Sequence, residues 1–115
     1  MSREKGDVAE KLAVQYLCSL GFVILGRNYA MRGAEIDIIA QEGDFVVFVE
    51  VRARKSARFA TPRESVTLAK QRRIRMAALR WLQEKGLGEA NIRFDIMEVL
   101  GERPTLLRGA FDASE

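Results

Sequence analysis

The sequence predicts an α/β domain with a mixed central sheet, in which an antiparallel hairpin is flanked by helices in the order α-β-β-β-α-β. Two helical stripes predict this class, together with the strand-like runs 35–41 and 45–54 that lie between them, joined by Gly43-Asp44. With 115 residues, 48% hydrophobic and 30% charged, the chain has the size and composition of one domain, residues 1–115.

The first helix is predicted over residues 7–20. Its apolar residues recur every three or four positions, and the predicted buried stripe is Val8, Leu12, Ala13, Tyr16, Leu17 and Leu20. Cys18 lies beside this stripe and is predicted to pack within the helix interface. Gly21 is a typical residue for the end of a helix. Residues 22–25 then predict a short strand that ends at the turn-prone residues 26–28.

The hairpin has a predicted register. A two-residue Gly43-Asp44 loop places Glu42 opposite Phe45. One face is then apolar, with the pairs Ile36–Val51, Ile38–Val49 and Ala40–Val47. The other face pairs Ile39 with Phe48, Asp37 with Glu50, and Glu35 with Arg52. A shift by one residue would bring charge into the apolar face, so the pattern favours this register.

The second helix has a start signal at Thr61-Pro62-Arg63-Glu64, where Thr61 and Glu64 have the spacing of a capping box. A kink or restart is expected near Thr67, and Lys85-Gly86 ends the helix. Its predicted buried face is Ile74, Ala77, Ala78, Trp81 and Leu82. Residues 91–100 predict a further strand, residues 105–107 an edge strand, and residues 55–60 a basic loop.

The composition excludes several kinds of chemistry. The sequence has no histidine, which excludes Ser-His and Cys-His catalysis and histidine-ligated metals. One cysteine cannot form an internal disulfide. The sequence shows no apolar run long enough to span a bilayer and no signal-peptide core near Met1, so we expect a cytoplasmic protein.

The charge is unevenly distributed. The formal net charge is +3, yet residues 52–80 carry ten basic residues against Glu64, a net +9, and the rest of the chain carries −6. Such a segment predicts a polyanionic partner, nucleic acid above all. A solvated helix face is the alternative, but such faces usually alternate the sign of their charges.

Asp37 and Glu50 are the notable pair of the hairpin. Like charges that face each other across two strands destabilise a sheet, so something must compensate them. A divalent cation is one candidate, because Mg²⁺ binds one or two carboxylates and keeps waters for substrate phosphates. A raised pKa on one carboxyl group, or ion pairs with Arg52 and Arg54, is the other.

The chain resembles a known family. Gly33-x-Glu35-Ile36-Asp37, followed by Phe48-Val49-Glu50-Val51-Arg52, resembles the D…(D/E)xK signature of the PD-(D/E)xK nuclease superfamily. More closely, the chain is similar to the YraN-like family of uncharacterised bacterial proteins, which resemble Holliday junction resolvases. The resemblance covers nearly the whole chain, from Gly6 and Glu10 to Arg93-Phe94-Asp95. It implies a restriction-endonuclease-like core.

The resemblance also implies an activity, the metal-dependent hydrolysis of phosphodiester bonds in DNA, including branched or structured DNA. Asp37 and Glu50 would hold Mg²⁺ or Mn²⁺, with Glu10 as a third acidic ligand or, alternatively, a carboxylate facing solvent. Arg52 occupies the position of the superfamily's lysine. Arginine cannot accept a proton, so Arg52 would stabilise charge on the phosphate or form an ion pair with Glu35. Lys55 or Lys70 could supply an amine instead.

The predicted nucleic-acid-binding residues are Arg54, Lys55, Arg58, Lys70 and Arg73. A homodimer is the assembly that the resemblance to resolvases suggests. Two other function classes stay open from the residues: a nucleic-acid-binding or assembly module that keeps the fold without catalysis, and a protein-interaction subunit whose basic face meets an acidic partner.

Overall fold

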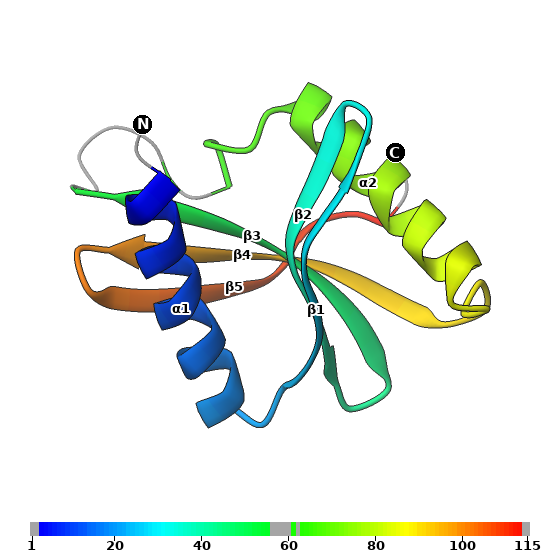
Figure 1. Ribbon diagram of the computed structural model, residues 1–115, viewed down its shortest axis with the longest axis horizontal. Helices are drawn as coiled ribbons and strands as arrows, with labels where there is room; N and C mark the ends of the chain where they lie inside the picture. Colours follow the sequence, from blue (N-terminus) through cyan, green and yellow to red (C-terminus); the bar gives the residue numbers. More distant parts are fainter. Residues whose placement is uncertain (1–2, 56–60, 62, 114–115) are drawn as a thin grey trace.

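The protein folds into a five-stranded sheet with two helices (Figure 1). The computed structural model describes residues 3–55, 61 and 63–113, with the backbone alone for residues 3–6. Its elements are α1 Arg3–Ser19, β1 Val23–Met31, β2 Ala34–Glu42, β3 Phe45–Arg54, α2 Leu68–Glu84, β4 Asn91–Leu100 and β5 Arg103–Phe111. The strands lie in chain order; β3 and β4 are parallel and the other neighbours antiparallel. The predicted mixed α/β class is confirmed.

The helices cover opposite faces of the sheet. Val47 and Val49 of β3 pack in the cluster that contains α1, whereas Val46 and Phe48 pack in the cluster that contains α2. Successive residues of a strand point to opposite faces, which is why one strand serves both cores. In the part of the chain that the structure describes, no helix is long and apolar enough to cross a membrane.

Helix α1 contacts the sheet along a narrower line than predicted. Ala9, Ala13 and Leu17 are buried, and their spacing of four residues places them on one side of the helix. Val8 is 58% exposed and Cys18 is exposed, so their predicted burial is wrong. The flanking residues Leu12, Val14 and Tyr16 are only partly buried against the same cluster.

The hairpin has the predicted register over its first half. Glu42 pairs with Phe45, and the ladder continues to Ile38–Val49. It stops there, so the predicted pairs Ile36–Val51, Asp37–Glu50 and Glu35–Arg52 are not formed as ladder pairs. Ile36 packs in the cluster on the α2 side, not with Ile38 as predicted. The reason is the twist of the β1–β2 hairpin, which turns away from β3 at this point (Figure 1).

Strand β1 is longer than the predicted strand at residues 22–25. Gly26 and Asn28, which predicted a turn, are instead accommodated within the strand. A bulge lies between Ile24 and Gly26, and Asn28 has a φ of 53°. A bulge takes up an extra residue and increases the local twist without ending the pairing. Similarly, the short edge strand predicted at residues 105–107 is part of the longer β5.

Helix α2 begins at the predicted restart. Thr61 and Glu64 do form a reciprocal capping box, with Thr61 N donating to Glu64 Oε1 at 2.9 Å and Glu64 N to Thr61 Oγ1 at 3.2 Å. That capping box stabilises a turn and does not begin a helix. Thr67 is the N-cap of α2, and its hydroxyl oxygen accepts a hydrogen bond from Lys70 N. All five predicted buried residues of the helix are buried, and Lys85 is its C-cap. Pro62 lies outside the described residues.

A buried ion network joins β2, β4 and β5. Asp95 is fully buried, and both of its oxygens accept from Arg93, at 2.8 and 2.9 Å. Arg93 also donates to Glu42 at 2.7 Å, and Gly109 N donates to Asp95 Oδ1 at 3.0 Å. Hydrogen bonds from Arg108 and Arg93 lower the pKa of Glu42 to about 2. The hairpin end of the sheet is thus held by paired charges.

We predict that Arg93→Ala destabilises the protein by about 3–5 kcal/mol, because it leaves the buried Asp95 without its cation. Urea unfolding measures the change in the free energy of unfolding. Arg108→Ala is the matched control, since Arg108 binds the same Glu42 but its side chain is 47% exposed. This control should cost about 1 kcal/mol or less. Equal effects of the two substitutions would contradict the structural role of Arg93.

Candidate functional site

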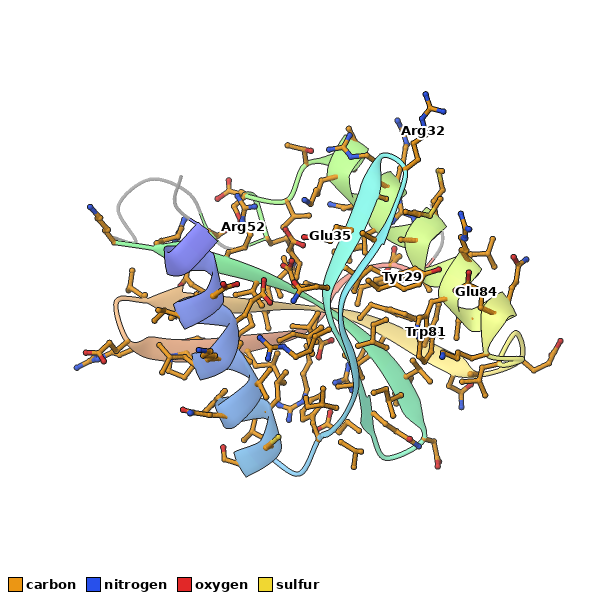
Figure 2. All side chains as sticks on the ribbon, viewed as in Figure 1. Tyr29, Arg32, Glu35, Arg52, Trp81 and Glu84 are labelled. Atoms are coloured by element: carbon orange, nitrogen blue, oxygen red, sulfur yellow. The ribbon has the colours of Figure 1, made fainter. Side chains whose placement is uncertain are left out.

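The candidate site is a recess that opens where β2 separates from β3. It has a volume of about 470 Å³, and its lining includes Glu10 from α1, Asp37 from β2, and Glu50, Arg52 and Arg54 from β3. The three predicted metal ligands and Arg52 therefore come together from three elements. Figure 2 shows Arg52 and Glu35, which also lines the recess, near the divergence of the two strands.

Asp37 lies at the point of divergence. Its Oδ2 accepts a hydrogen bond of 2.8 Å from Val51 N, so the side chain binds a β3 backbone group just beyond the end of the ladder. Burial, and then the charge of Glu50, raise the pKa of Asp37 to about 7. The like-charge encounter predicted from the sequence is real, although it does not take the form of a ladder pair.

Glu10 brings a third carboxyl group from α1. The residue is 9% exposed, so the alternative of a carboxylate facing solvent is wrong. Burial, followed by the charge of Asp37, raises the pKa of Glu10. Its Oε1 is buried without a hydrogen-bond partner and lies 3.6 Å from Arg27 Nη2. A buried, under-satisfied carboxylate oxygen is a group that a cation would stabilise.

Glu50 is 5% exposed and lies close to two cations. Arg52 Nη1 is 3.5 Å from Glu50 Oε2, and Lys70 Nζ is 3.6 Å from the same oxygen. Arg52 therefore forms the ion pair with Glu50 that the sequence offered as one compensation for this carboxylate, and not the alternative pair with Glu35. Among the described residues, ion pairs compensate Glu50, whereas the charges that act on Asp37 are acidic.

Lys70 reaches the site because of where α2 begins. Thr67 caps the helix, which places Lys70 in the first turn, beside the recess. The sequence identified Lys70 as a candidate amine but could not place it, because it offered two start signals for the helix, at Thr61 and at Thr67. Arg27 was missed altogether. Its strand was predicted to end before it, whereas Arg27 pairs with Ile38 and reaches Glu10.

The carboxylates suit a hard divalent cation. Mg²⁺ and Mn²⁺ prefer oxygen ligands, and Asp37, Glu50 and Glu10 offer them in a buried setting where acidic neighbours and desolvation raise the pKa values of Asp37 and Glu10. Within residues 3–55, 61 and 63–113, no three acidic or cysteine side chains already form a group that could hold one ion. The match of this site to a divalent cation therefore depends on Asp37 and Glu50, with Glu10 as a nearby third carboxyl group.

The predicted nucleic-acid-binding residues are spread around this recess. Arg54 lines it and also forms a 2.7 Å ion pair with Glu98 on β4. Lys55 lines an adjoining recess beside α1, and Lys70 and Arg73 line another beside α2. Arg58 lies outside the described residues. The cations thus border the acidic centre on two sides.

We predict a pH-dependent effect of Asp37→Asn on stability. The folded-state pKa of about 7 exceeds the ordinary value of 3.8, so the wild type loses stability as pH rises from about 4 to 7. Asparagine keeps an oxygen for Val51 N and carries no charge. The variant should therefore be more stable than the wild type at pH 8, and this advantage should vanish near pH 4.

Thermal unfolding at the two pH values measures this difference. Glu89→Gln is the control, because Glu89 is an exposed carboxylate outside the recess and should change stability little at either pH. If Asp37→Asn were destabilising at pH 8, the ionised Asp37 carboxylate would not reduce stability, which contradicts the prediction.

Comparisons with known proteins identify the family of the chain. The model of the uncharacterised protein family UPF0102 matches residues 9–99. A UPF0102 protein of Rhodococcus opacus is 42% identical over 111 residues, which cover 92% of this chain and 94% of the relative. A UPF0102 protein of Myxococcus xanthus is 44% identical over 115 residues, covering 96% and 91%. The chain therefore belongs to the UPF0102 family, as its resemblance to YraN-like proteins predicted.

Proposed function

We propose that this protein is a metal-dependent nuclease that hydrolyses phosphodiester bonds in DNA, in particular branched or structured DNA. The observation that carries the proposal is the meeting of Glu10, Asp37 and Glu50 in one recess, with Lys70 and Arg52 at Glu50. Two buried carboxylates and a partly buried one, brought together from three elements, are costly to stability, and such strain is typical of functional sites. The order Asp37, then Glu50-x-Arg52 after a hairpin, also has the spacing of the PD-(D/E)xK nucleases.

In this proposal Asp37 and Glu50 hold Mg²⁺ or Mn²⁺, and Glu10 is the third acidic group. A bound ion of this kind polarises a phosphoryl oxygen and lowers the pKa of a bound water, which is chemistry that needs no histidine. The chain's own contribution is to fix the carboxylates: Val51 N orients Asp37, and Arg52 and Lys70 orient Glu50.

Arg52 and Lys70 have different roles in the proposal. Arg52 stays protonated and can donate two hydrogen bonds to a phosphate. Lys70 carries the titratable amine that Arg52 lacks, and it lies at nearly the same distance from Glu50. In the D…(D/E)xK signature, a lysine lies two residues after the glutamate. We therefore assign the role of that lysine to Lys70.

The cations around the recess would bind the DNA backbone. Lys55, Lys70 and Arg73 line recesses that adjoin the acidic centre, and Arg54 lines the centre itself. Contacts of this kind are largely independent of sequence and weaken as salt concentration rises. Binding should therefore show a steep salt dependence.

The first test is cleavage of a panel of linear, flapped and four-way DNA in Mg²⁺ or Mn²⁺. Asp37→Ala and Glu50→Ala should each lower the rate by about a hundredfold or more, because each removes a proposed metal ligand. Calorimetry should show that Asp37→Asn also loses binding of the free ion. Glu35→Ala is the matched control, since Glu35 lines the recess but is exposed. Wild-type rates in either of the first two variants would overturn the proposal.

A binding module without turnover is the second candidate, and the arginine at position 52 favours it. The discriminating variants are Arg52→Lys and Lys70→Met. If Lys70 supplies the amine, Lys70→Met should reduce cleavage by about tenfold to a hundredfold or more, in keeping with the usual size of proton-transfer contributions. Lys85→Met, at the other end of α2, should have no effect. Cleavage that appears only in Arg52→Lys would indicate that the natural protein binds DNA without cutting it.

A further inference from the structure

The acidic recess is the centre of a longer groove. At one end it shares Asp7, Ala9, Ala53 and Arg54 with a second recess, of about 770 Å³, between α1 and the ends of β3 and β4. At the other end it shares Glu35 with a third, of about 410 Å³, between the β1–β2 hairpin and α2. The three recesses therefore adjoin one another at these residues.

The two arms of the groove differ in chemistry. The arm beside α1, here called the apolar arm, is lined by Val8, Leu12, Ala53 and Val99 among others, with Lys11, Arg54 and Lys55 also in its lining. The arm beside α2, here called the cationic arm, is lined by Lys70 and Arg73. Arg32 lies at the tip of the hairpin that borders the cationic arm (Figure 2).

Val8 makes the apolar arm unusual. It is 58% exposed, although it lies next to the α1 residues that pack on the sheet. An exposed valine by itself is ordinary. Here, however, it borders a recess that adjoins the acidic centre and whose volume lies in the range of sites for small molecules or single nucleotides. The recess thus adds apolar side chains to the charged residues that line the rest of the groove.

We propose that the apolar arm binds the unpaired nucleotides of a DNA strand whose backbone crosses the acidic centre, so that the substrate is DNA at a junction between duplex and single strand. This inference rests on the proposed function. A duplex hides its bases in the stack and offers phosphates, which the cationic arm suits. An unpaired nucleotide also offers the flat apolar surface of its base, which Val8, Leu12 and Ala53 can contact. Lys11, Arg54 and Lys55 suit its phosphate.

The test measures binding without cleavage, by fluorescence anisotropy in EDTA at low salt. The probes are a blunt duplex and the same duplex with a single-stranded overhang. Val8→Tyr should strengthen binding of the overhang probe about fivefold or more, because a tyrosine at this position adds a platform on which a base can stack. Binding of the blunt duplex should stay within about twofold of the wild type, since the change adds no charge.

Leu79→Tyr is the matched control. Leu79 is 56% exposed, close to the value for Val8, and it lies on α2 away from the groove residues. It should alter neither probe. Val8→Ser, which removes apolar surface, should weaken binding of the overhang probe selectively. Circular dichroism and thermal unfolding check that all three variants fold.

The outcomes separate the two proposals. If the wild type binds and cuts DNA but Val8→Tyr and Val8→Ser leave the ratio of the two affinities unchanged, the apolar arm does not bind unpaired nucleotides and the nuclease proposal stands. If the wild type binds neither probe and also cuts no DNA in Mg²⁺ or Mn²⁺, both proposals fail. If the Leu79→Tyr control shifts the ratio as much as Val8→Tyr, the effect is a general one of added aromatic surface and the inference is overturned.

Discussion

The separation of β2 from β3 beyond the Ile38–Val49 pair is the constraint on which the candidate site depends. Had the ladder continued, Asp37 and Glu50 would lie in a continuous sheet with no recess between their strands. Instead the bulged and twisted β1–β2 hairpin turns away, and the Asp37 side chain accepts a hydrogen bond from Val51 N. This contact fixes one carboxyl group where the strands part, while Glu50 stays in the sheet on β3. The opening also lets Glu10 approach from α1.

Two groups of acidic residues in this fold have neighbours of opposite charge. The first is paired with arginines, and the second lies beside further acids. Asp95 and Glu42 are fully engaged by Arg93 and Arg108, so their charges stabilise the structure, and the pKa of Glu42 is lowered. Asp37 lies near Glu50 and acts on Glu10, and the pKa values of Asp37 and Glu10 are raised by burial and by these acidic neighbours. A protein that needed only stability would have no reason to keep the second arrangement. The contrast therefore separates a structural ion network from a candidate functional one.

Helix α2 connects the site to the rest of the molecule. Its first turn brings Lys70 to Glu50, and its last turn holds the β1–β2 hairpin through a 2.7 Å hydrogen bond from Tyr29 to Glu84 (Figure 2). In the same last turn, Trp81 packs edge-on against Phe48, with ring centroids 6.0 Å apart. The strand that carries Glu50 and the hairpin that carries Asp37 are thus both packed on one rigid helix. Such support is what a site needs to hold its groups in place.

The sequence by itself determined the elements with strong periodicity: the register of the hairpin next to its Gly43-Asp44 loop, the buried face of α2, and β4, because these depend on local spacing and turn chemistry. It also selected Asp37, Glu50 and Glu10 as the acids to examine. Only the tertiary structure decided that β1 continues through Gly26 and Asn28, that Val8 stays exposed, and that Arg52 and Lys70 meet at Glu50. These outcomes depend on how far the hairpin twists from β3 and on which of two start signals α2 uses. Both are set by contacts between residues far apart in the chain, which no local pattern contains.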